Sequence, residues 1–328
     1  MEIRKETMKS IVIEKTLGGR PYVGNPHVRF DDRGVVSAVT SRCCFLLCKK
    51  FMVLAFVVLG SVSSWADAAT VDEAVVWSNA MSTGLPVRVI LPYGYREGTN
   101  RYPSVYLLHG AGGSCRVMSD VLEQRLCDTF QIIGIVPEGT KASWWWDSPT
   151  EPHMCFETFV ANDVRAWADR TYRTIPRRDK RAIVGESMGG HGACWIGFRH
   201  RDIFGAVGNI YGGVDVRPFE GKWSLEKRLG PQGENPERWL EHSVLTAAAK
   251  LRNGDIELLT VVGTDDIFLI PNRRMHELLS ANRVRHFYLE VRGEDEALSS
   301  HTHSFRKAAE PVVFRFIDRY FREGKGYL

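Results

Sequence analysis

The pentapeptide Gly185-Glu-Ser-Met-Gly189 constrains the fold of this chain more than any other stretch. It follows the apolar run 181–184 and precedes residues with helical spacing up to Phe198. A serine between two glycines at such a junction is typical of a strained strand-to-helix turn that projects the hydroxyl from a sheet. The pattern predicts that Ser187 is a nucleophile. It also predicts that the Met188 amide, at the helix N-terminus, donates to the developing oxyanion.

The rest of the chain alternates between short apolar runs and segments of helical periodicity. Runs typical of strands occur at 87–91, 104–108, 132–136, 181–184, 256–262 and 286–291. The almost wholly apolar run 132–136 is expected to be a strand covered on both faces, and 181–184 another buried strand. Helical spacing is found at 156–172, 193–198, 273–279 and 305–320. The alternation predicts an α/β fold with a mostly parallel, doubly wound sheet and helices on both faces. We expect a single domain over residues 69–328.

A second oxyanion donor is predicted where the strand 104–108 ends in His109-Gly-Ala-Gly-Gly113. A glycine-rich loop at the carboxyl end of a strand can turn its backbone N–H groups toward a substrate carbonyl. We expect the Ala111 amide to be this donor. His109 is expected to be a structural loop residue and not a general base.

A serine nucleophile needs a base and a carboxylate that orients the base, and in this type of fold the chain order is Ser, acid, His. Asp265 and Asp266 follow the strand 256–262, and either could be the acid. His301 and His303 both fall on the loop expected before the last helix. Chemical reasoning leaves both histidines open as the base.

The charge distribution argues against a nucleic-acid partner. The net charge is +4, and the first 68 residues hold ten Lys or Arg and six Asp or Glu, whereas residues 69–328 hold 33 of each. A neutral body has no basic footprint of the kind that nucleic acids require. The four cysteines after residue 68 have no metal-binding spacing and could be paired or free. We expect no metal and no organic cofactor.

The leader is typical of a secretory signal peptide. Lys49-Lys50 precedes the apolar run 51–60, and Ala66-Asp-Ala68 follows it. The run is too short for a transmembrane helix, which needs about 20 residues. We expect cleavage after Ala68, a secreted or periplasmic product and no stable membrane span. We also expect translation to start near Leu46 or Leu47, which makes the stretch upstream a mis-assigned start.

Several further motifs occur in a fixed order along the chain. They are Ser143-Trp-Trp-Trp-Asp-Ser-Pro149, Phe156-Glu-Thr-Phe159, Tyr172-Arg-Thr-Ile175 and Ala182-Ile-Val-Gly-Glu-Ser-Met-Gly-Gly-His-Gly192. With these motifs the chain resembles, over residues 84–322, the putative esterase family, the esterase D-like group of α/β-hydrolases. That group includes feruloyl and acetyl-xylan esterases, S-formylglutathione hydrolases and mycolyltransferases. The resemblance implies an α/β-hydrolase fold and a serine carboxylic-ester hydrolase.

The resemblance also selects the acid and the base. A Gly-x-x-Asp acid implies Asp266, three residues after Gly263. Matching the family's late histidine motif to His301 keeps the last helix in register, with Phe305 in the place of a tyrosine, whereas His303 is a rival match. The acidic segment 292–298 departs from the family, which has a short Pro-Gly turn there.

The expected function is that of a secreted serine esterase that removes acetyl or feruloyl groups from plant polysaccharide. Trp145 is expected to bind the substrate, since aromatic rings stack on sugars and phenolic groups and ligands bind at the carboxyl ends of strands in such sheets. The alternative for this tryptophan cluster is packing in the core. Other functions in view are a mycolyltransferase-like acyltransferase, an S-formylglutathione hydrolase-like thioesterase, a peptidase and a non-catalytic binding protein.

Overall fold

A computed structural model describes residues 68–293 and 296–326 and, before residue 68, only the backbone of four short strands. These strands are β1 (Val12–Leu17), β2 (Arg20–Pro21), β3 (Val28–Phe30) and β4 (Val36–Ala38). The predicted signal segment at residues 49–67 lies outside the described residues. Among the helices that are described, none has both the length and the apolar character needed to cross a membrane.

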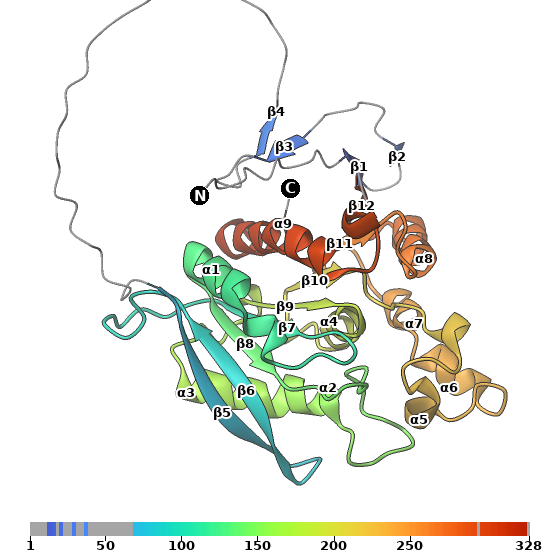
Figure 1. The fold of residues 1–328 in the computed structure, drawn as a ribbon, viewed down its shortest axis with the longest axis horizontal. Coiled ribbons are helices and arrows are strands. Elements are labelled where there is room, and N and C mark those ends of the chain that lie inside the picture. The colour runs from blue at the N-terminus through green and yellow to red at the C-terminus, as the bar shows by residue number, and fades with distance from the viewer. Residues whose placement is uncertain are drawn as a thin grey trace, which may run out of the picture.

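A mostly parallel sheet forms the centre of the molecule (Figure 1). Its later strands are β5 (Thr70–Ser78), β6 (Thr83–Leu91), β7 (Ser104–Leu108), β8 (Ile133–Pro137), β9 (Arg181–Glu186), β10 (Ala206–Ile210), β11 (Glu257–Gly263) and β12 (Phe287–Arg292). The strand order is β2-β1-β12-β11-β10-β9-β7-β8-β6-β5. Strands β7 to β12 run parallel, whereas β5, β6 and β1 pair antiparallel with their neighbours. Every residue of β7, β8 and β10 is buried, as expected for strands covered on both faces.

Helices cover both faces of this sheet. They are α1 (Val121–Phe130), α2 (Phe156–Thr158), α3 (Arg165–Thr171), α4 (Met188–Arg199), α5 (Leu225–Leu229), α6 (Pro236–Glu241), α7 (Val244–Ala248), α8 (Leu269–Ala281) and α9 (His303–Glu323). Helix α1 packs against α9 on one face, and α4 packs against β7, β9 and β10 on the other (Figure 1). The predicted doubly wound α/β sheet is therefore confirmed.

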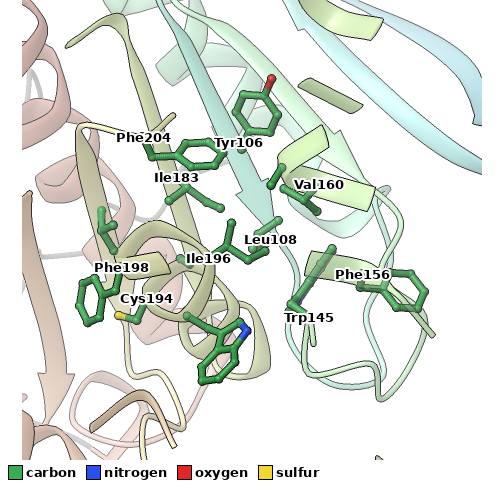
Figure 2. Packing of buried hydrophobic residues seen from close by; sticks show 14 of the residues in the cluster. Tyr106, Leu108, Trp145, Phe156, Val160, Ile183, Cys194, Ile196, Phe198 and Phe204 are labelled. Atoms are coloured by element: carbon green, nitrogen blue, oxygen red, sulfur yellow. The ribbon is translucent and has the colours of Figure 1, made fainter. Parts of the chain in front are cut away.

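Two hydrophobic clusters fill the space between the sheet and its helices. One cluster joins the inward side chains of α4 to one face of the sheet, and Figure 2 shows Ile183, Leu108 and Ile196 within it. The other cluster joins α1 and α9 to the opposite face. Neighbouring residues of β9 divide between them, since Ile183 belongs to the first and Val184 to the second. This alternation is the two-residue period of a strand covered on both sides.

The elements differ from the sequence predictions in several places. Strands β5 and β10 were not predicted, and neither were helices α1, α5, α6 and α7. The helix predicted over 156–172 is interrupted by a π-helical turn at Phe159–Val164. The last helix begins at His303, so that residue lies in a helix and not on the preceding loop.

Candidate active site

Ser187 occupies a strained turn between β9 and α4. Its φ and ψ angles are 56° and −118°, and it directly precedes the first residue of the helix. The flanking glycines leave room for this turn. A Cβ on Gly185 would lie 2.1 Å from the carbonyl oxygen of Gly189, and a Cβ on Gly189 would lie 1.9 Å from that of Leu108. Any side chain at either position would collide with backbone, so the turn requires glycine.

Ser187 is hydrogen-bonded to His301, and His301 to Asp266. His301 Nε2 lies 2.8 Å from Ser187 Oγ, and its Nδ1 lies 2.9 Å from Asp266 Oδ2. Asp266 is only 6% exposed, and its Oδ1 accepts a hydrogen bond of 2.7 Å from the Phe268 amide. The two ring nitrogens of His301 therefore face a hydroxyl and a fixed carboxylate, as the transfer of a serine proton requires.

The other two candidates lie outside this chain of hydrogen bonds. Asp265 accepts a hydrogen bond from the Ser299 hydroxyl. His303 is exposed in the first turn of α9, and among the described residues it has no hydrogen bond to Ser187 or Asp266. A Cβ on Gly263 would lie 2.0 Å from the Ser299 carbonyl oxygen. The acid loop and the histidine loop therefore touch at this glycine, which places Asp266 within reach of His301.

The loop after β7 places one backbone amide differently from its neighbours. The amide of Gly110 donates to Glu186 Oε1 at 2.9 Å, that of Gly112 to the Lys141 carbonyl at 2.8 Å, and that of Gly113 to the Gly110 carbonyl at 3.0 Å. The Ala111 amide is the one in this stretch with no acceptor among the described residues. This loop begins beside the start of α4, since Gly189 abuts Leu108.

His109 is a structural residue of the same loop, as expected. Its ring is fully buried, with Nδ1 2.9 Å from the Gly110 carbonyl oxygen and Nε2 3.0 Å from the Gly139 amide. The carbonyl can only accept and the amide can only donate, so Nδ1 carries the proton and Nε2 is the acceptor. Both nitrogens are occupied by backbone, so the ring is not available as a base.

The prediction that Trp145 binds the substrate is wrong. Trp145 is 0% exposed, and its neighbours Trp144 and Trp146 are buried as well. Its Nε1 donates to the His109 carbonyl at 3.3 Å, and its ring occupies the space that a Cβ on Gly192 would need. Figure 2 shows Trp145 beside Phe156 in the packed core. Motif position cannot distinguish a ring that lines a site from one that supports it, since both lie at the end of a strand.

Aromatic residues that were not predicted from the sequence contact His301. The Tyr211 ring centroid lies 4.3 Å from that of the imidazole, and the Phe268 ring meets it edge-on at 5.4 Å. Trp223 and Phe219 continue from Phe268, with centroids 5.5 and 5.0 Å from its ring. A prediction of β10 would have drawn attention to Tyr211, the residue after that strand.

The remaining candidate reactive groups are metal ligands and cysteine thiols. Within residues 68–293 and 296–326, no group of three or more His, Cys, Asp and Glu side chains could hold a metal ion. The four cysteines described there are free thiols, and three of them are buried: Cys115, Cys127, Cys155 and Cys194, with Cys155 partly exposed. Burial raises the pKa of Cys115 to about 11, so this thiol stays protonated and unreactive at neutral pH.

Comparisons with known proteins point to one family. The model of the family described as "Putative esterase" matches residues 78–312. Esterase Rv1288 of Mycobacterium tuberculosis is 30% identical over 136 residues, which are 40% of this chain and 30% of that protein. This chain therefore matches less than a third of the length of that relative.

Solved structures show the same fold. A ferulic acid esterase superposes with a TM-score of 0.63 at 21% identity, covering 77% of this chain and 99% of that one. An S-formylglutathione hydrolase from Agrobacterium tumefaciens superposes with a TM-score of 0.65 at 17% identity, covering 80% and 99%. At these identities the likeness concerns the fold, and the predicted α/β-hydrolase fold is confirmed.

Proposed function

This chain belongs to the Putative esterase family, and on that basis we propose that it is a serine hydrolase that cleaves carboxylic esters. The observation that carries the proposal is the chain of hydrogen bonds from Ser187 through His301 to Asp266, with distances of 2.8 and 2.9 Å. The strained turn at Ser187 supports the same role, because strain of this kind is concentrated at functional sites.

The proposed reaction passes through an acyl-enzyme. Ser187 Oγ attacks the ester carbonyl carbon while His301 Nε2 takes the hydroxyl proton, and Asp266 stabilises the imidazolium through Nδ1–H. The amides of Ala111 and Met188 donate to the oxyanion, and one such donor typically lowers the barrier by about 3 kcal/mol. The leaving alkoxide takes the proton from His301. Water then attacks the acyl carbonyl carbon and gives a proton to His301. His301 passes this proton to Ser187 Oγ as the bond between Oγ and the acyl carbon breaks, which releases the acid and restores the enzyme.

Replacement of the nucleophile tests the reaction. Ser187→Ala removes the attacking oxygen and keeps the fold intact. We therefore expect the variant to lose p-nitrophenyl acetate hydrolysis and labelling by a fluorophosphonate probe. His303→Ala is the matched control, because this exposed histidine lies outside the hydrogen-bonded chain, and it should keep both properties. Turnover that survives in Ser187→Ala would refute the role of Ser187.

For the substrate, we propose an acetyl or feruloyl ester of a carbohydrate. The support is the row of aromatic rings from Phe268, which contacts His301, to the partly exposed Trp223 and Phe219. Aromatic faces suit both phenolic acyl groups and sugar rings. The ferulic acid esterase with the same fold adds to this support.

Export is proposed from the leader alone. A basic pair, an apolar run and an Ala-x-Ala end favour cleavage after Ala68 and a secreted or periplasmic protein. N-terminal sequencing of the protein recovered outside the cytoplasm tests this. A mature chain that begins near residue 69 supports cleavage of a signal peptide and export. Retention of residues 1–40 would contradict this cleavage and the predicted start near Leu46 or Leu47.

Two other substrate classes share the same acyl-enzyme. A thioesterase is one alternative, because the S-formylglutathione hydrolase has a similar fold. An acyltransferase is the other, because a hydroxyl group can replace water in the second step. A panel of methyl ferulate, acetylated xylan and S-formylglutathione distinguishes the hydrolases. Formation of a transesterified product in excess acceptor alcohol would identify a transferase.

A further inference from the structure

Two side chains next to Ser187 and His301 have no part in the proposed mechanism. Tyr211 follows β10 and is 2% exposed, and Glu186 is the last residue of β9, directly before Ser187. We propose that both are positioning residues: Tyr211 fixes the loop that carries His301, and Glu186 fixes the loop that carries the Ala111 amide. This inference rests on the proposed function and adds residues to its site.

Tyr211 contacts the His301 loop in two ways. Its ring lies against the imidazole, with centroids 4.3 Å apart and planes inclined at 50°. Its hydroxyl donates a 3.2 Å hydrogen bond to the carbonyl oxygen of Thr302. The ring therefore supports one face of the catalytic base, and the hydroxyl holds the next peptide along the chain. Together the two contacts restrict both the rotamer of His301 and the position of its backbone.

The backbone of Tyr211 is itself held under strain. Its φ angle is 38°, a value that bulky residues rarely adopt. Its amide donates a 2.8 Å hydrogen bond to the Val261 carbonyl of β11, which fixes this conformation. A strained conformation persists only where the surroundings determine it, and in this conformation the ring lies against His301.

Glu186 holds the loop after β7, which carries the Ala111 amide and is called the oxyanion loop below. Its Oε1 accepts a 2.9 Å hydrogen bond from the Gly110 amide, one residue before Ala111. The contact is close, since a Cβ on Gly110 would lie 2.6 Å from the same oxygen. Ser187 and Ala111 are thus each one residue away from this hydrogen bond. It ties the nucleophile to the amide that would stabilise its oxyanion.

The two residues also interact with each other. Burial and then the negative charge of Glu186 raise the pKa of Tyr211, so the phenol remains a hydrogen-bond donor throughout the working range of an esterase. The charge of Arg306 on α9 acts in the opposite direction and lowers the pKa of the same phenol. The pair therefore connects the oxyanion loop, the nucleophile turn and the His301 loop, three segments that are far apart in the sequence.

Substitutions at Tyr211 separate positioning from packing. In the full chain, Tyr211→Phe keeps the ring and loses the hydroxyl, and we expect kcat to fall about three- to tenfold with KM unchanged. Tyr211→Leu also loses the ring, and we expect a fall of about 100-fold, since small misplacements of a catalytic group have effects of this size. Tyr106→Phe, a buried tyrosine on β7 whose hydroxyl has no hydrogen bond in the described residues, is the control and should keep wild-type kcat.

Substitutions at Glu186 test the second half. Glu186→Gln keeps an oxygen that accepts from Gly110, so it should retain most of kcat, whereas Glu186→Ala should lose about tenfold or more. The rate of fluorophosphonate labelling should follow kcat in all variants. Their melting temperatures should equal that of Tyr106→Phe.

Three results would overturn the inference: Tyr211 variants with wild-type kcat, variants in which only KM rises, or Glu186→Gln as impaired as Glu186→Ala. Failure of the wild-type protein to react with the probe would instead refute the proposed function itself.

Discussion

Asp265 and Asp266 are adjacent and identical in side chain, yet only one of them faces the base. Asp266→Asn should lower kcat about 10⁴-fold, because an amide at this position favours the wrong tautomer of His301 and cannot stabilise its charge. Asp265→Asn is the matched control. Asp265 accepts a hydrogen bond from Ser299 and no bond from His301, so we expect kcat to stay within about tenfold of wild type. Steady-state kinetics on p-nitrophenyl acetate decides between them, and equal losses in both variants would contradict the assignment.

Single residues could be predicted from the sequence where backbone geometry determines them, and not where side-chain direction does. Ser187 could be located because its turn demands glycine on both sides. The choice between Asp265 and Asp266, or between His301 and His303, depended on the family resemblance, since neighbours of one type differ only in where they point. The expectation for Trp145 failed for the same reason, because its ring points into the core.

Helix α4 approaches its surroundings closely at its glycines. A Cβ on Gly192 would lie 2.5 Å from Cγ of Trp145, near the root of that side chain, where the ring cannot swing away. Gly192→Ala gains about 1 kcal/mol of helix propensity, but overpacking of this kind costs about 1–3 kcal/mol. We expect net destabilisation in urea unfolding. Gly233→Ala is the control, because a Cβ at Gly233 would meet open space, and it should be neutral or slightly stabilising. A stabilised Gly192→Ala would contradict the prediction and show that the loop carrying Trp145 moves to make room.

Helices and strands were predictable where the hydrophobic pattern indicated a single type of secondary structure. The apolar runs of β7, β8 and β9 could only be buried strands, and they were found within a few residues of their predicted positions. Strand β10 contains Gly208 and Asn209, which are unfavourable in strands, and tertiary packing overrides that preference. Asn209 instead bonds Thr260 and Asn272 in the interior. Missing β10 also meant missing Tyr211 beside the active site.

At the scale of the whole molecule, a buried ionic cluster joins α1 to α9 behind the active-site face. Arg306 Nη1 lies 3.4 Å from Glu123 Oε1 and 3.5 Å from Glu310 Oε1, and all three side chains are at most 1% exposed. One guanidinium cannot neutralise two buried carboxylates, and an uncompensated buried charge is costly. Burial and then the charge of Glu123 raise the pKa of Glu310 well above its ordinary value, so this carboxyl keeps its proton to a higher pH in the folded chain than in the unfolded one.

The raised pKa of Glu310 makes the stability of the fold depend on pH. In the unfolded chain its carboxyl ionises above about pH 4.3, so between that pH and the raised folded-state pKa unfolding releases a proton. The contribution of Glu310 is therefore complete below pH 4.3 and declines by about 1.4 kcal/mol per pH unit as pH rises through this window. Glu310→Gln keeps the shape and cannot ionise, so its free energy of unfolding in urea should fall less steeply from pH 5.5 to pH 8.5 than that of the wild type. Glu237→Gln, on the exposed side of α6, should leave the wild-type slope unchanged. A slope equally steep in Glu310→Gln would mean that Glu310 is ionised in the folded protein and that Arg306 holds both carboxylates.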